Sequence, residues 1–136
     1  MDSFDEKIIQ SIKEVAISNQ LDLVVLFGSH AKNRAVKESD IDIGIYGDRY
    51  ISWDEKIELS LEFSKIFKSD NLDVQIISSN SPLLMHNILS SGKVLFEKKK
   101  GVFSMLKLYA WKIFADSKSF RDNCFRIIKE RSLRIQ

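Results

Sequence analysis

The chain has few of the residues that interrupt or cross-link a fold. Among its 136 residues there are one cysteine, one proline and five glycines. The single cysteine, Cys124, excludes an internal disulfide and suits a reducing cytoplasm. No apolar run approaches the roughly 20 residues that a membrane helix needs, and residues 1–6 are acidic where a signal peptide would be basic. We therefore expect a cytoplasmic protein without a membrane span.

Two common nucleotide-binding signatures are also absent, because the sequence has neither a G-x-G-x-x-G motif nor a P-loop. With 44% apolar and 29% charged residues, the chain has the composition and length of one globular domain. No combination of aromatic and basic residues outside the C-terminal segment favours direct nucleic-acid binding.

The charge is unevenly distributed along the chain. Residues 1–92 carry 9 Lys/Arg and 15 Asp/Glu, a net charge of −6, whereas residues 93–136 carry 12 and 4, a net charge of +8. A basic tail on an acidic body indicates either an acidic partner for the tail or a solvated basic helix. The pattern leaves both interpretations open.

Short apolar runs rich in branched residues predict four strands. They lie at Leu23–Phe27, Ile41–Tyr46, Leu72–Ile77 and Val94–Glu97. Helical spacing and capping residues predict a helix over about 3–18, a second from Ser52, and a third from Ser81-Pro82 to Gly92. Because this order is not a regular βαβ alternation, we expect an α/β (α+β) fold with a mixed sheet covered on one face by helices.

The residues after Gly101 contain no proline, and their apolar side chains are spaced for one or two helices. We therefore divide the chain into a body, residues 1–97, and a helical tail, residues 98–136. The tail is rich in large apolar side chains for a terminal segment. It is expected to pack on the body, to dock on a partner, or to do both.

Two carboxylates occupy unusual places in the second predicted strand. Residues two apart in a strand point to the same side, so Asp40 and Asp42 face one way while Ile41 and Ile43 face the core. Carboxylates this close repel each other unless a cation lies between them, and Mg²⁺ prefers such oxygen ligands together with substrate phosphates. If the third strand lies beside the second, Asp73 completes a cluster that two metal ions can share.

A glycine and a serine follow the first predicted strand. Gly28 allows the backbone to approach a phosphate closely, and Ser29 offers its hydroxyl and nearby N–H groups to an anion. Lys32 and Arg34 follow in the loop before the carboxylates, where they either neutralise phosphates or are simply solvated.

In combination, Gly28-Ser29, ten intervening residues, Asp40-x-Asp42 and a later strand aspartate resemble the nucleotidyltransferase superfamily related to DNA polymerase beta. A chain this short most resembles the minimal nucleotidyltransferase (MNT) antitoxins of HEPN/MNT toxin–antitoxin pairs. The resemblance covers about residues 3–97. It implies a polymerase beta-like fold in which Gly28 and Ser29 hold phosphates, and Asp40, Asp42 and Asp73 bind two Mg²⁺ ions.

The resemblance also implies an activity. The chain is expected to be the antitoxin of a type VII-like pair, in a hetero-oligomer with its toxin. It would transfer AMP from ATP to a tyrosine of the HEPN-domain RNase toxin, with Asp73 helping to activate the acceptor hydroxyl. The alternatives are a non-catalytic antitoxin that neutralises its partner by binding, and a small-molecule nucleotidyltransferase. The roughly 40 residues after the body are few for a second core that would hold a small acceptor.

The loop after Ser29 departs from the pattern of many relatives, Gly-Ser-Arg-Ala-Arg-Gly. Here His30 and Lys32 replace arginines and Asn33 replaces a glycine. Lys32 keeps a positive charge but cannot make the two-pronged contact of an arginine. These differences bear on nucleotide affinity rather than on the metal ligands.

Overall fold

The computed structural model describes residues 6–28 and 41–135. Four strands form one sheet in the order β3-β2-β1-β4. They are β1 (Leu23–Phe27), β2 (Ile41–Tyr46), β3 (Leu72–Ile76) and β4 (Lys93–Glu97). β1 pairs antiparallel with both β2 and β4, whereas β2 and β3 are parallel. The predicted mixed sheet is therefore confirmed, with β3 at one edge and β4 at the other.

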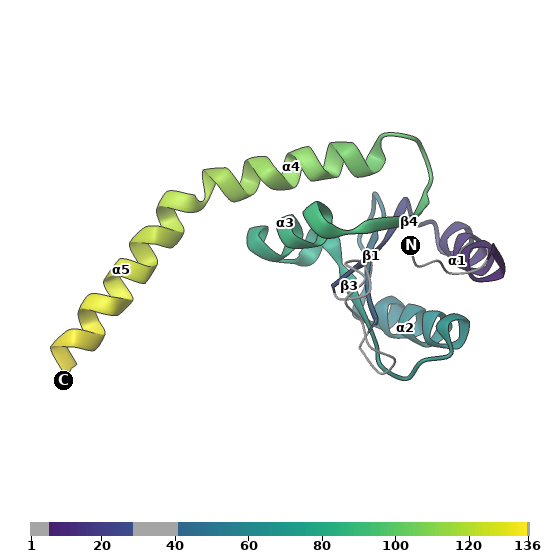
Figure 1. The fold of residues 1–136 in the computed structure, drawn as a ribbon, viewed down its shortest axis with the longest axis horizontal. Coiled ribbons are helices and arrows are strands. Elements are labelled where there is room, and N and C mark those ends of the chain that lie inside the picture. The colour runs from purple at the N-terminus through teal and green to yellow at the C-terminus, as the bar shows by residue number, and fades with distance from the viewer. Residues whose placement is uncertain (1–5, 29–40, 136) are drawn as a thin grey trace.

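Five α-helices and one short 3-10 turn complete the described fold (Figure 1). They are α1 (Glu6–Ser18), α2 (Trp53–Phe67), η1 (Ile77–Ser79), α3 (Pro82–Ser91), α4 (Val102–Asp116) and α5 (Lys118–Ile135). Two of the three predicted helix starts are confirmed: Ser52 and Glu55 form a capping box on α2, and Ser81 accepts a hydrogen bond from the Leu84 N–H at the start of α3. The start predicted near residue 3 lies outside the described residues.

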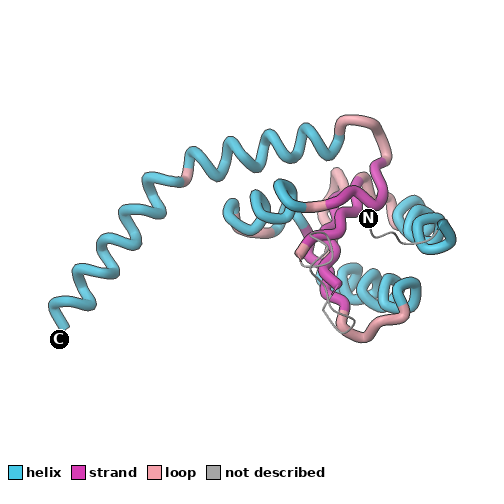
Figure 2. The backbone as a smooth tube through the Cα atoms, viewed as in Figure 1, coloured by secondary structure: helices cyan, strands magenta, loops and turns pink. Residues whose placement is uncertain are grey.

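Helices cover both faces of the sheet, so the prediction of a single covered face was wrong (Figure 2). α1 and α2 bury one face, where Ile12, Phe63 and Ile43 belong to one core cluster. α3 and α4 bury the other, where Ile88 and Leu106 join the cluster around Val25. The helices can divide in this way because β1, at the centre of the sheet, is apolar on both sides.

Glycines let α3 approach the sheet closely. A Cβ on Gly44 of β2 would lie 3.1 Å from the Ile88 side chain and 3.2 Å from that of Ile77. A Cβ on Gly92 would collide with the Val25 side chain and the Ile88 carbonyl. The missing side chains thus set how α3 packs on the face that also carries Asp42.

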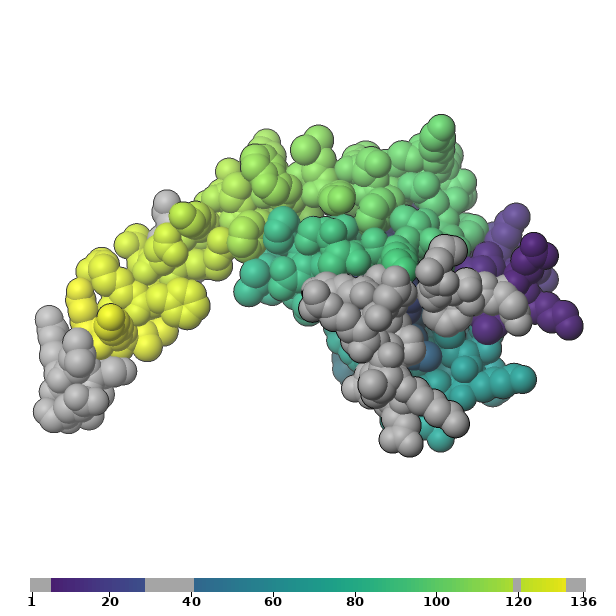
Figure 3. Space-filling model, in the orientation of Figure 1, coloured from purple at the N-terminus to yellow at the C-terminus, as the bar shows by residue number. Residues whose placement is uncertain are grey.

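The tail changes its relation to the body at Ser117. α4 packs along α3, with Leu106 and Ala110 buried and the rings of His86 and Phe114 stacked 4.5 Å apart. α5 then runs away from the body (Figures 1 and 3), and none of its described side chains is buried. Among the described residues, no helix is long and apolar enough to cross a membrane.

Candidate active site

The parallel pairing of β2 and β3 brings two of the predicted metal ligands together. Asp42 and Asp73 are direct partners in the β2–β3 register. Partners in neighbouring strands lie roughly 5 Å apart and point to the same side of the sheet. Ile41 and Ile43 point the other way and are buried under α1 and α2. The opposite orientation of Asp42 and its apolar neighbours, expected from the sequence, is thereby confirmed.

Gly28 lies on the other side of Asp42. β1 ends at Phe27, which is the register partner of Asp42, and Gly28 follows with a φ of +80°. A Cβ at Gly28 would collide with a carboxylate oxygen of Asp42. The glycine is therefore required twice, once for its backbone conformation and once for the space beside the carboxylate.

The site thus has a defined order across the sheet. Gly28 belongs to the β1 side, Asp42 lies in the middle, and Asp73 lies on the edge strand β3. Asp73 is exposed, and Asp42 is partly buried. The turn at Gly28 and the two acidic side chains therefore lie next to one another across three neighbouring strands.

Sequence reasoning missed Gln75. Its side-chain amide donates a hydrogen bond of 2.7 Å to a carboxylate oxygen of Asp73. The pattern of the strand contains the signal, because Gln75 follows Asp73 by two residues and so shares its face, while Val74 and Ile76 turn into the core. Gln75 therefore orients the carboxylate.

The other predicted site residues, Ser29, Lys32, Arg34 and Asp40, lie outside the described residues, as do His30 and Asn33. Their roles remain predictions. Gly28 and Ile41 border this segment, so the segment connects the glycine end of β1 to the carboxylate end of β2.

The match to a protein-family model identifies the family in which this geometry occurs. Residues 8–101 match the family described as polymerase beta, nucleotidyltransferase. The chain belongs to this nucleotidyltransferase family. A comparison with curated protein sequences gives no match.

Solved structures share the fold of this nucleotidyltransferase. A chain of a toxin–antitoxin crystal structure with AMP-PNP superimposes with a TM-score of 0.78 at 20% identity, covering 89% of this chain and 98% of that one. A chain from a complex of a tri-AMPylated Shewanella oneidensis HEPN toxin with an MNT antitoxin gives 0.74 at 18% identity, covering 91% and 98%. A chain of the MntA–HepT toxin–antitoxin complex gives 0.74 at 19%, covering 92% and 99%. The polymerase beta-like fold expected from the sequence is thereby confirmed.

The described part of the nucleotidyltransferase site fits a divalent cation. Asp42 and Asp73 supply hard oxygen donors side by side, as Mg²⁺ requires, and the absence of a side chain at Gly28 leaves room for the Asp42 carboxylate. Within residues 6–28 and 41–135, no group of three His, Cys, Asp or Glu side chains could hold a metal. Asp40, the other carboxylate that the sequence predicts as a ligand, lies outside these residues.

Two other polar residues of the nucleotidyltransferase, Asp22 and His86, have structural roles. Asp22 accepts a 2.9 Å hydrogen bond from the backbone N–H of Asp48, at the end of the sheet opposite Asp42. His86 stacks between α3 and α4. Burial, with the nearby charges of Asp48 and Asp22, raises the pKa of Tyr46 above its usual value, so this phenol stays neutral.

Proposed function

We propose that the chain is a Mg²⁺-dependent nucleotidyltransferase of the MNT type, the antitoxin of a HEPN/MNT pair. It transfers AMP from ATP to a tyrosine of the HEPN-domain toxin in the cytoplasm. The observation that carries this proposal is the arrangement of Gly28, Asp42 and Asp73 across three neighbouring strands of a nucleotidyltransferase fold. The neighbours bound to AMP-PNP and to an AMPylated HEPN toxin support the choice of nucleotide and acceptor.

The site residues have different roles in the reaction. The backbone at Gly28, with Ser29, Lys32 and Arg34, holds the triphosphate. Asp40, Asp42 and Asp73 would hold two Mg²⁺ ions, which would neutralise phosphate charge and favour attack by the acceptor hydroxyl. Asp73 accepts the proton of that hydroxyl. The phenolic oxygen bonds to the α-phosphorus, the bond to the β-phosphate breaks, and pyrophosphate leaves.

The test is transfer of label from α-labelled ATP to the HEPN-domain protein encoded beside this chain. Asp42→Asn should abolish labelling, because it removes a negative charge from the centre of the site, while the fold survives. Asp48→Asn, an exposed aspartate beyond the far end of β2, is the matched control and should label normally. Full labelling by Asp42→Asn would refute the assignment.

A second function, neutralisation by binding alone, is favoured by the exposed tail. Phe125 and Ile128 of α5 are 69% and 61% exposed, and this helix belongs to the basic part of the chain. We propose that residues 1–97 form the catalytic body and that α5 docks on the HEPN protein.

Ending the chain before Lys118 should then abolish the complex and leave the melting temperature unchanged, because no described α5 side chain is buried. An unweakened complex would refute docking by α5. If Asp42→Asn still protects cells from the toxin, binding alone is the function.

A further inference from the structure

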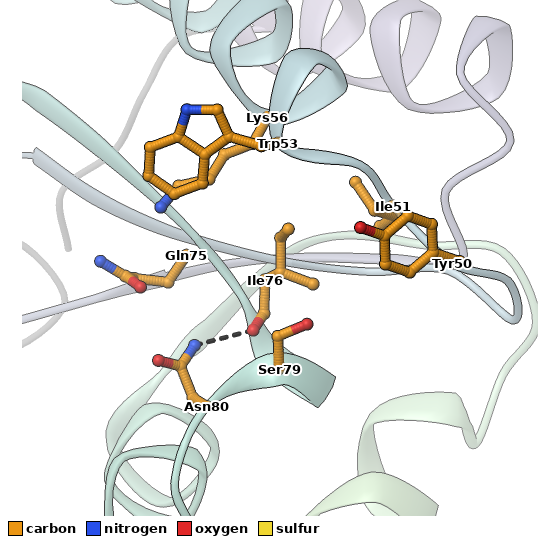
Figure 4. A pocket seen from close by; sticks show the side chains of 8 residues that line it. All are labelled: Tyr50, Ile51, Trp53, Lys56, Gln75, Ile76, Ser79 and Asn80. Atoms are coloured by element: carbon orange, nitrogen blue, oxygen red, sulfur yellow. Dashed lines mark hydrogen bonds between the residues drawn. The ribbon is translucent and has the colours of Figure 1, made fainter.

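A hollow of about 340 Å³ opens at the carboxyl end of the edge strand β3 (Figure 4). It contains side chains from the loop after β2, the start of α2, the end of β3 and the segment after it. They are Tyr50, Ile51, Trp53, Lys56, Gln75, Ile76, Ser79 and Asn80. Apart from Gln75, which orients Asp73, none of them has a place in the metal or phosphate site described above.

The hollow is linked to the acidic site through Gln75. This side chain lines the hollow and also donates its hydrogen bond to Asp73. Two residues along a strand span roughly 6.6 Å, so the backbone of Gln75 lies about that far from the backbone of Asp73, and the Gln75 side chain reaches back to the Asp73 carboxylate. A group bound here would be a close neighbour of whatever reacts at Asp73.

The order of the strands in the sheet indicates which substrate lies nearest to the hollow. The phosphate-binding turn at Gly28 follows β1, whereas the hollow lies at β3, with β2 and its Asp42 in between. The triphosphate is therefore expected on the β1 side of the carboxylates. The hollow lies on the side from which the acceptor hydroxyl must approach.

The side chains at the hollow suit a polypeptide ligand. Trp53 is 65% exposed and Tyr50 is 81% exposed, and exposed aromatic rings are frequent anchors in protein recognition. The Lys56 ammonium lies 4.5 Å from the centre of the Trp53 ring and is the only charged group among the described residues that line the hollow. Amides and a hydroxyl on the opposite wall can bond to a peptide backbone.

The walls are held in place before any ligand binds. Arg49 donates to the Tyr50 carbonyl at 3.0 Å and pairs with Glu55 at 2.8 Å, which joins the loop to the start of α2. The Asn80 amide donates to the Ile76 carbonyl at 2.7 Å, the dashed bond of Figure 4. A fixed shape of this kind lowers the entropic cost of binding.

We infer that this hollow is the acceptor-recognition site of the nucleotidyltransferase, and that it receives an extended segment of the acceptor protein beside the modified hydroxyl. The inference rests on the proposed transfer to a protein. Because residues two apart in an extended segment are also separated by roughly 6.6 Å, the side chain that enters the hollow is two positions from the modified residue.

The test compares exposed side chains of one helix and its preceding loop. Trp53→Ala and Tyr50→Ala should each lower kcat/KM for the HEPN-domain protein about 10-fold or more. Leu61→Ala, on the same helix and 60% exposed outside the hollow, is the matched control and should change it less than twofold. Affinity for α,β-methylene ATP with Mg²⁺, measured by calorimetry, should stay within twofold in all three variants.

Three outcomes would overturn the inference, and each has a different meaning. Loss of nucleotide affinity in Trp53→Ala would make the hollow a base-binding site. Unchanged kcat/KM in both aromatic variants would leave it without a role in recognition of the acceptor. If the unaltered protein binds the ATP analogue but labels no protein, the proposed function and this inference fall together, whereas loss in the aromatic variants alone supports both.

Discussion

Replacement of Gly28 by alanine should disturb both the backbone conformation of this residue and the position of the Asp42 carboxylate. The first effect is on the backbone, because a φ of +80° costs an L-residue about 1–2 kcal/mol. The second effect is steric, since the new Cβ would occupy the space of an Asp42 carboxylate oxygen. Moving that side chain away from its preferred rotamer adds about 0.5–1.5 kcal/mol. We therefore expect a loss of about 1.5–3.5 kcal/mol in the free energy of unfolding.

The effect on transfer should be larger than the effect on stability. A displacement of about 1 Å at a reacting centre can cost on the order of 100-fold in rate, and the Cβ would force Asp42 to move in order to be accommodated. Gly101→Ala is the matched control. Gly101 also has a positive φ, +103°, but a Cβ there would meet nothing within 4 Å. It should lose about 1–2 kcal/mol of stability and keep its activity.

The assay measures urea unfolding and the initial rate of label transfer for both alanine variants, with a Mg²⁺ titration of each rate. Gly28→Ala should need more Mg²⁺ and reach a lower maximal rate. Equal transfer rates in the two variants would show that the Asp42 carboxylate does not depend on the space beside Gly28. The proposed geometry of the site would then be refuted.

Three further predictions concern α2, whose start carries part of the acceptor hollow. Ser52→Ala should cost about 1 kcal/mol in urea unfolding, because it removes the cap on the Glu55 N–H. The hydrogen bond from Arg49 lowers the pKa of Glu55. The stabilisation that ionised Glu55 contributes is therefore complete above the ordinary carboxyl pKa and is lost as the pH falls through the lowered pKa. Glu55→Gln should make the melting temperature depend less on pH over that acid range. Phe63→Ala, at a fully buried ring, should cost about 3–5 kcal/mol, whereas Leu61→Ala should stay within about 0.5 kcal/mol; equal losses would contradict the assignment of the core.

Most strands could be predicted because local signals mark both ends. Leu23–Phe27 is a branched apolar run that ends at glycine, and Ile41–Tyr46 alternates around its aspartate. The third strand ends one residue earlier than predicted, at Ile76. The side chain of Asn80 binds the Ile76 carbonyl, and the chain turns into η1 at Ile77. The end of the strand therefore depends on Asn80, which lies beyond the apolar run that predicted the strand.

The covering of the second face could not be predicted, since it depends on how closely α3 approaches Gly44 and Gly92. Apolar spacing identifies which residues of a helix face inward but does not identify the sheet face they reach. In the site, the neighbouring positions of Asp42 and Asp73 followed from an assumed pairing of two strands, which the structure confirms. The acceptor hollow has no counterpart in a motif, because its walls come from two stretches that are distant in the sequence, residues 50–56 and 75–80.

The register of β2 and β3 ties the chemistry of this protein to its hydrophobic core. Because side chains alternate along a strand, a slip of one residue would turn Asp42 or Asp73 toward the apolar cluster and expose Ile43 or Val74. The free energy that holds those apolar residues under α2 therefore also penalises any misalignment of the carboxylates. Substitutions in the core that keep this register should preserve the site, so the core of this enzyme can diverge in sequence while its carboxylates stay aligned.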